Sequence, residues 1–322
     1  MEQVGLDRTA ATSPASQRFV RGNLFLLLAS LAWGTTFVVQ KTAMDHLGPF
    51  TYSGIRFLLG AFFLLPLVMY RFRKKSISPP VRCSPGAVLG ASLLTGFLVF
   101  AGINLQQIGL ISSTAGKGGF ITGLYVIIVP VLEIFFGQRA GTWGWIGAVL
   151  ALCGLYLLSV THGFVLAPGD GWILACALVW AFQVVSLSRL APKMDSLVLA
   201  FGQSLVCGVL SLAVAAMMER MSIEALKAAA FDLAYGGIVS VGFGFTLQVV
   251  GQKYAKASHA AIIMQFEAVF AVIAGWLILG EVLTPRGLAG CGLMLAGMLV
   301  SGAGQSGSRS RPGKSPDLSP PA

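Results

Sequence analysis

The stretch Ser113-Thr-Ala-Gly-Lys-Gly-Gly-Phe-Ile-Thr-Gly-Leu-Tyr-Val-Ile-Ile-Val-Pro130 places a lysine between glycines and then runs directly into apolar residues. A phosphate-binding loop requires Gly, four residues, and then Gly-Lys-Ser/Thr. Here Gly118 follows Lys117, and Ile111 stands where the first glycine should be. The stretch therefore does not predict a nucleotide site, and its apolar part favours a helix within a membrane.

Composition also indicates a membrane protein. Of 322 residues, 56% are hydrophobic and 11% are charged, whereas an average soluble domain is roughly 25% charged. A soluble fold of this size cannot hide so much apolar surface from water. The 40 glycines suit closely packed membrane helices, because they stand among apolar residues. We therefore expect an all-α membrane protein.

Residue types that carry enzyme chemistry are not grouped in the sequence. The five cysteines and three histidines show no metal-ligand spacing. The sequence contains no HExxH motif, nucleophile elbow or dinucleotide fingerprint. We expect no cofactor, no metal and no enzymatic activity; a membrane-embedded enzyme acting on a lipid or peptide is the minor alternative.

Ten apolar runs are long enough to span a bilayer as helices, which takes about 20 residues. The polar residues 1–21 and the basic, Ser/Pro-rich residues 305–322 cannot bury enough surface to fold, so we expect disordered cytoplasmic tails. The predicted spans are 22–41, 50–70, 85–108, 112–136, 142–160, 170–189, 196–218, 232–252, 258–280 and 285–304.

Lysines and arginines are distributed unevenly between the two sides. If the chain starts in the cytoplasm, 16 of the 22 Lys and Arg residues fall in cytoplasmic segments and four fall outside. Because cytoplasmic loops are enriched in these residues, we expect both termini in the cytoplasm and the protein in the plasma or inner membrane. The net charge of +10 then reflects contact with anionic lipid headgroups, and we expect no nucleic-acid partner.

The two halves of the chain resemble each other. Trp33 in LLLASLAWGTTFVVQK aligns with Trp180 in ILACALVWAFQVVSLS, 147 positions later. Gln107 and Gln252 align at an offset of 145 within FAGINLQQIGLISSTAG and FTLQVVGQKYAKASHAA. Because five crossings are an odd number, the second copy must enter the membrane from the opposite face. We expect inverted five-helix repeats at 22–160 and 170–304, with a site between them near the midplane.

The spans also contain motifs of a known family. LLASLAWGTTFVVQKTA and GIRFLLGAFFLLPL stand in the first half, FITGLYVIIVPVLEIFFGQR in the fourth span, and EAVFAVIAGWLILGEVLTPRGLAGCGLMLAGMLV in the last two. On these motifs the chain resembles the drug/metabolite transporter superfamily, in its ten-helix, EamA-like exporter branch. The resemblance covers about residues 22–304. It implies secondary active export of a small metabolite, an amino acid or a drug by alternating access, and a passive channel is the alternative.

The chain departs from the family pattern in two places. Gln138 replaces the acidic residue that often ends the fourth span. Ala268 follows Glu267 where many relatives have proline. A proline kink in the ninth span is therefore not expected.

Glu267 is the acidic residue predicted deepest in the bilayer. It lies about nine residues into the ninth span, which is roughly 14 Å at 1.5 Å per residue. It shares a helix face with Ala260, Ala271 and Ala274, and that face must meet protein or a cavity because a lipid-facing carboxylate costs several kcal/mol. We expect a proton-coupling or substrate-amine site, or alternatively a protonated carboxyl hydrogen-bonded between helices.

Two basic side chains lie inside predicted spans. Lys117 is in the fourth span and Arg56 in the second, both in the outer half of the bilayer. A long basic side chain at this depth either extends to the headgroups or contributes a charge to an outer cavity. For Lys117 the two interpretations are evenly matched, and for Arg56 packing and snorkelling are slightly favoured over substrate contact.

Polar and aromatic residues recur at one-turn spacing in several spans. They form a stripe in the first span, a copy of it in the sixth, and pairs in the third and eighth. Such side chains either hydrogen-bond between helices, which is modestly stabilising, or line a cavity that suits a zwitterionic solute. With Tyr125 of the fourth span, these candidates are Trp33, Thr36, Gln40, Trp180, Gln183, Asn104, Gln107, Gln248 and Gln252.

Overall fold

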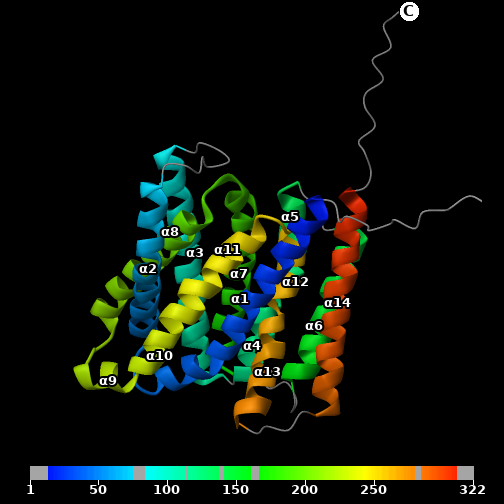
Figure 1. Cartoon of the computed structure of the whole chain (residues 1–322). Helices are drawn as coiled ribbons and strands as arrows, with labels where there is room; N and C mark the ends of the chain where they lie inside the picture. The colour runs from blue at the N-terminus through cyan, green and yellow to red at the C-terminus, as the bar shows by residue number, and fades with distance from the viewer. Residues whose placement is uncertain are drawn as a thin grey trace, which may run out of the picture.

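The computed structural model describes residues 14–74, 84–113, 115–137, 141–160, 167–279 and 284–309. Gln138 and most of the two predicted tails lie outside these ranges. Within them, the side chains of several helical residues, including Phe37, Lys41 and Lys117, also lie outside the described part. The described residues fold into helices joined by short connections, without a strand among them (Figure 1).

In chain order the elements are α1 (Pro14–Met44), α2 (Pro49–Arg73), α3 (Pro85–Ser112), α4 (Ala115–Gly123), α5 (Tyr125–Phe135), α6 (Gly141–Ser159), α7 (Asp170–Leu190), the 3₁₀ turn η1 (Ala191–Lys193), α8 (Ser196–Met218), α9 (Ile223–Ala228), α10 (Ala230–Tyr235), the π-helix η2 (Gly236–Phe245), α11 (Thr246–Gln252), α12 (Ala257–Met264), α13 (Phe266–Leu279) and α14 (Pro285–Arg309). Several starts follow from local sequence. Pro49 and Pro85 occupy first turns, where no backbone donor is needed. Ser84 caps α3 and Asp195 caps α8.

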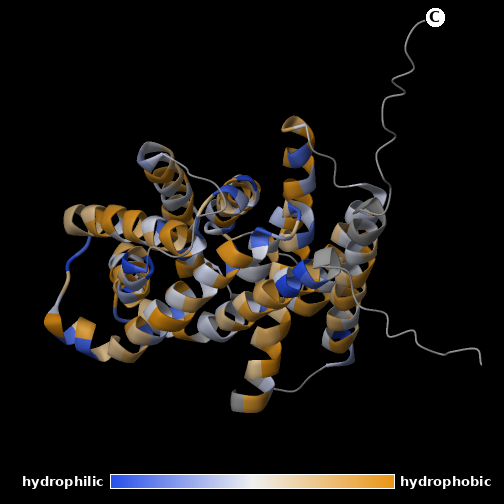
Figure 2. Ribbon diagram, turned by 45° about the horizontal axis from the view of Figure 1, so that its top comes forward, coloured by the Kyte–Doolittle hydropathy of each residue, from blue (hydrophilic) through white to orange (hydrophobic). Residues whose placement is uncertain are grey.

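Among the described residues, nine helical segments are long and apolar enough to cross a membrane. Each overlaps one of the predicted spans from the second to the tenth. The first predicted span lies in α1, which includes residues outside the described part and is not one of the nine. Hydrophobic residues predominate along most of the helices (Figure 2). The chain is an all-helical, multi-pass membrane protein.

The start of α1 and the end of α14 extend into residues that the sequence analysis expected to be disordered. Residues 14–21 were predicted as part of a disordered tail, but α1 begins at Pro14. The Phe19 ring stacks on His259 at 5.3 Å, and this contact favours order in the first turns of α1. Likewise α14 continues to Arg309, and the next proline after Pro285 is Pro312.

Two of the spanning segments are interrupted near their middle. Leu124 separates α4 from α5, and Gln265 separates α12 from α13. At each interruption the backbone forms a tighter turn: Ile127 N donates to Leu124 O at 3.0 Å, and Ala268 N donates to Gln265 O at 3.1 Å. The Gln265 side chain crosses to the other interruption and donates to Gly123 O at 2.9 Å. The ninth span is thus interrupted without a proline.

Glycines let α6 and α14 approach backbone to backbone in opposite directions. A Cβ atom at Gly154 would lie 2.5 Å from Gly290 O, and one at Gly147 would lie 2.6 Å from Gly297 O. Gly147 and Gly290 are 143 positions apart, and so are Gly154 and Gly297. Gly147 and Gly154 of the first half thus contact Gly297 and Gly290, which are the equivalents of Gly154 and Gly147 in the second half.

The pair α2 and α8 repeats this arrangement. A Cβ at Gly54 would lie 2.7 Å from Leu212, and one at Gly208 would lie 2.8 Å from Leu58.

A carboxylate also joins α2 to α8 at each end of this helix pair. Glu219 accepts from the backbone nitrogens of Phe50 and Thr51 at the start of α2, at 2.9 and 2.8 Å. Asp195 at the start of α8 pairs with Arg71 at the end of α2.

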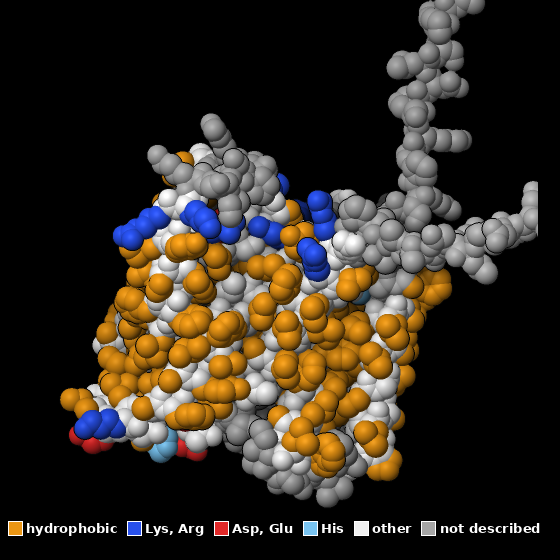
Figure 3. All heavy atoms as spheres, viewed as in Figure 1, with side chains coloured by type: hydrophobic (Ala, Val, Ile, Leu, Met, Phe, Trp, Pro, Cys, Tyr) orange, Lys and Arg blue, Asp and Glu red, His pale blue; other side chains and the backbone are white. Residues whose placement is uncertain are grey.

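The two ends of the bundle differ in charge. α1 begins and α14 ends at the same end (Figure 1), and Lys and Arg side chains gather there (Figure 3). They come from the start of α1, the end of α2, the end of α7 and the residues before α12. Burial lowers the pKa of Lys253 there, as does Arg71, while Asp195 opposes the shift. We call this the basic end.

Substitution of Gly290 by valine should separate α6 from α14. Overpacking of this kind costs about 1–3 kcal/mol, because the added methyl groups would meet Gly154 O at the site of closest approach. We expect the melting temperature of the purified protein to fall by several degrees. Gly292→Val on the same helix is the control, since a Cβ at Gly292 has no atom within 4 Å. Equal losses in both variants would contradict the assigned contact.

Candidate functional site

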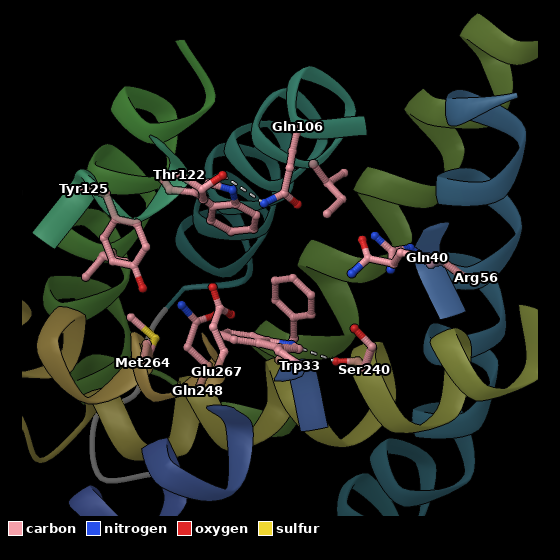
Figure 4. Close-up of a pocket in the computed structure, with 14 residues that line it drawn as sticks. Trp33, Gln40, Arg56, Gln106, Thr122, Tyr125, Ser240, Gln248, Met264 and Glu267 are labelled. Carbon is pink, nitrogen blue, oxygen red and sulfur yellow. Dashed lines mark hydrogen bonds between the residues drawn. The ribbon is translucent and has the colours of Figure 1, made fainter. Parts of the chain in front are cut away.

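A cavity lies inside the bundle, bordered by α1, α2, α3, α7, η2, α11 and both interrupted spans (Figure 4). The space open to the centres of water molecules is about 60 Å³, where one water needs roughly 10–15 Å³. In this conformation the cavity holds several waters or a small solute. It is lined by Trp33, Gln40, Arg56, Ile103, Gln106, Thr122, Tyr125, Trp180, Val184, Ser240, Phe245, Gln248, Met264 and Glu267.

Three aromatic rings form one wall of the cavity. Phe245 contacts Trp33 at a centroid distance of 5.1 Å and Trp180 at 6.1 Å. Trp33 also donates from Nε1 to Ser240 O in the π-helix at 3.2 Å. A Cβ at Gly244 would lie 2.5 Å from Trp33 Nε1, so glycine is needed there. The aligned tryptophans of the two halves thus meet at one phenylalanine.

Glu267 lies in the first turn of α13, directly after the interruption at Gln265. A Cβ at Gly34 would lie 2.5 Å from Glu267 O, so glycine allows α1 to approach this turn closely. The carboxylate faces the cavity (Figure 4) and has no hydrogen bond or ion pair with any described side chain. Tyr125 opens α5 after the other interruption and lines the same cavity. The interruptions therefore deliver an acidic and a phenolic side chain to one space.

Arg56 carries the opposite charge into the cavity. The side chain is only 1% exposed, so the snorkelling interpretation is wrong. Its guanidinium lies over the Tyr52 ring at 4.7 Å and beside Phe57 at 5.4 Å, and such contacts stabilise a cation. None of its three nitrogens has a hydrogen-bond acceptor among the described residues. In Figure 4, Trp33 lies between Glu267 and the pair formed by Gln40 and Arg56.

Amide side chains also line the cavity. Gln40 and Gln248 were predicted from the sequence, and Gln106 was not. Gln248 exchanges hydrogen bonds with Gln183 at 3.1 and 3.5 Å. Gln106 donates to Thr122 Oγ1 at 3.2 Å. Gln106 and Thr122 were not predicted, although Gln106 stands next to Gln107. The other lining residues that sequence reasoning missed are Ile103, Val184, Ser240, Phe245 and Met264.

Several predicted candidates lie outside the cavity. Thr36 donates to Ala32 O within its own helix. Asn104 donates to Ser211 Oγ at 3.0 Å and to Phe100 O at 2.8 Å. The remaining three are Gln183, Gln252 and Gln107, all buried. The side chain of Lys117 lies outside the described part of the chain. Of the predicted candidates, the structure brings together Trp33, Gln40, Arg56, Tyr125, Trp180, Gln248 and Glu267.

Comparison with known proteins relates this architecture to membrane transport. The profile of the EamA-like transporter family matches the chain twice, over residues 20–160 and 167–303. A crystal structure of a protein with 19% sequence identity superposes with a TM-score of 0.73, covering 90% of this chain and 99% of that one. The structural likeness shows that the fold is shared.

Curated relatives are named as transporters. An uncharacterized transporter of Archaeoglobus fulgidus is 30% identical over 86% of this chain and 84% of its own length. The uncharacterized transporter YoaV of Bacillus subtilis is 26% identical over 88% and 97%. The uncharacterized inner membrane transporter YedA of Escherichia coli is 25% identical over 69% of each chain.

We expect the buried guanidinium of Arg56 to decrease the stability of the folded protein. A buried guanidinium without an acceptor is costly, so Arg56→Met should raise the melting temperature by a few degrees, where about 1 kcal/mol corresponds to roughly 2–4 °C. Arg71→Met, which removes an ion pair with Asp195, is the comparison and should be neutral or destabilising. A lower melting temperature for Arg56→Met would identify Arg56 as a packing residue.

Proposed function

Because the chain belongs to the EamA-like transporter family, we propose that it is a secondary active exporter that moves a small solute through this cavity by alternating access. The observation that carries the proposal is the presence in one cavity of Arg56, whose nitrogens have no acceptor among the described residues, and of Glu267, whose carboxyl group can carry the opposite charge. Charges without partners in a membrane interior are expensive and are kept for function.

We further propose ten spanning helices arranged as two inverted repeats, with both termini in the cytoplasm. The double match of the family profile supports the repeats. The reciprocal glycine contacts of α6 with α14, and of α2 with α8, support a two-fold relation between the halves. The gathering of Lys and Arg at the end where α1 begins supports the orientation.

The charges also favour one class of solute. Arg56 offers donors to a carboxylate, and Glu267 accepts from an ammonium group. No ion pair joins the two described side chains, and Trp33 lies between them in the view of Figure 4. A solute that carries both charges would satisfy both residues at once, while the rings of Trp33, Trp180 and Phe245 contact its apolar part. We propose a small zwitterion, such as an amino acid.

Counterflow in liposomes should reveal this preference. We expect exchange of leucine, and at least tenfold weaker exchange of leucinamide, which lacks the anion, and of N-acetylleucine, which lacks the cation. Each analogue leaves one charge of the cavity unpaired. In Arg56→Gln, leucine and leucinamide should exchange at similar rates. Equal exchange of all three solutes by the parent protein would contradict a zwitterion site, and flux that never saturates would indicate a channel.

We propose that Glu267 also carries the coupling proton. A carboxyl group that is exposed to each side in turn can release a proton on one side and take one up on the other. The cavity position of Glu267 and its lack of a fixed partner support this role. The competing interpretation is a protonated carboxyl that only joins helices.

Substitution of Glu267 by glutamine should uncouple transport from the proton gradient. The amide keeps the shape of the side chain and loses only titration, so gradient-driven efflux should disappear while some downhill exchange persists. Glu219→Gln is the control, because Glu219 accepts backbone hydrogen bonds at the other end of the bundle from the basic end and lies outside the cavity. A full gradient response in Glu267→Gln would assign Glu267 a structural role.

A further inference from the structure

Glutamine hydrogen bonds join α7 and α11 between the cavity and the basic end, and we call this contact a seam. Gln248 lines the cavity and exchanges hydrogen bonds with Gln183 of α7. One turn further along α11, Gln252 Nε2 donates to Val184 O at 3.2 Å. Gln183, Gln248 and Gln252 are each 1% exposed or less. Polar side chains therefore join α7 and α11 between the cavity and the basic end.

The positions that correspond to this seam in the first half lie on α3 and α1. Gln107 aligns with Gln252, 145 positions apart, and Phe37 aligns with Val184 at the offset of 147 that relates Trp33 to Trp180. Gln107 is 0% exposed, yet neither its Nε2 nor its Oε1 has a partner among the described residues. A buried amide that lacks all its hydrogen bonds calls for an explanation, and Gln203 on α8 is a second one among the described residues. At equivalent positions of the two halves, Gln252 therefore donates a hydrogen bond and Gln107 has no partner among the described residues.

One pair of hydrogen bonds that joins the two halves does not show this difference. Asn23 of α1 lies 3.2 Å from His259 Nε2 at the start of α12. Its counterpart at the offset of 147, Asp170 of α7, accepts from Ser113 before α4 at 2.8 Å. Both of these bonds are present at once. This pair of bonds is present in both halves, whereas the hydrogen bond of Gln252 has no counterpart at Gln107.

We infer that Gln107 and Gln252 are alternating seals of the cavity, an inference that rests on the proposed alternating access. In the present state Gln252 holds Val184 O and closes the basic end. In the opposite state Gln107 donates to Phe37 O and closes the other end, while Gln252 releases Val184. Because the halves are related by inversion, the two states exchange the roles of the two seams.

Cysteine labelling from each side tests the exchange. Met264, which lines the cavity, is replaced by cysteine in a background without Cys83, Cys153, Cys176, Cys207 and Cys291. A small, membrane-impermeant methanethiosulfonate is added to either face of oriented proteoliposomes. Gln252→Leu should raise the ratio of basic-side to opposite-side labelling about threefold, and Gln107→Leu should lower it about threefold, as the mean value of one hydrogen bond between membrane helices implies.

Gln203→Leu is the matched control, because Gln203 on α8 is also 0% exposed and unpaired among the described residues, but it lies outside both seams. The inference is overturned if Gln107→Leu behaves like Gln203→Leu, or if both seam variants shift the ratio in the same direction. If Gln252→Leu does not fold, the comparison of Gln107→Leu with Gln203→Leu decides alone. Labelling from one face only, in the parent and every variant, would instead overturn alternating access itself.

Discussion

The hydrocarbon core of a membrane supplies no hydrogen-bond partner, and the rest of this structure depends on that constraint. Backbone groups are satisfied within helices, and polar side chains must find partners inside the protein. Many do: Ser30 donates to Ile263 O at 3.0 Å, and Gln265 satisfies the carbonyl of Gly123 at a helix interruption. Against this background, the unpaired groups of Arg56 and Gln107 stand out, and Glu267 faces the cavity. In the proposed mechanism, a solute or a second conformation supplies their missing partners.

Glycine contacts pack the helices around the site, and helix interruptions place the side chains that line it. The pairs α6 with α14 and α2 with α8 are fixed by reciprocal close approach, so they act as rigid supports. The interrupted spans lie between these supports and carry Tyr125 and Glu267 directly after their breaks. Each support takes one helix from each half. In the proposed alternating access, we therefore expect motion at seams held by a few side chains, such as that between α7 and α11.

Much of the fold follows from the sequence, because a membrane span is a local property of about 20 apolar residues. The site is harder to predict, since it depends on which face of each helix meets which neighbour. Depth alone identified Glu267, and the repeat identified Trp33 and Trp180. Gln106 and Thr122 were missed because their pairing joins two helices whose relative rotation the sequence does not specify. For Arg56 the sequence analysis favoured packing or snorkelling; burial rules out snorkelling, while the contacts with Tyr52 and Phe57 agree with packing.

The separation of Arg56 from Glu267 is itself a constraint on the site. If they bonded directly, the two charges would neutralise each other, and the cavity would lose both recognition groups. Trp33 lies between them in Figure 4, fixed by its bond to Ser240 O and by the space that Gly244 leaves for its ring. Under the proposed function, the absence of an ion pair between the described side chains of Arg56 and Glu267 leaves both available to a solute, at a cost in stability that proteins accept where function requires it. A solute with both charges would recover that stability when it binds, and would lose it again when the seams open and it leaves.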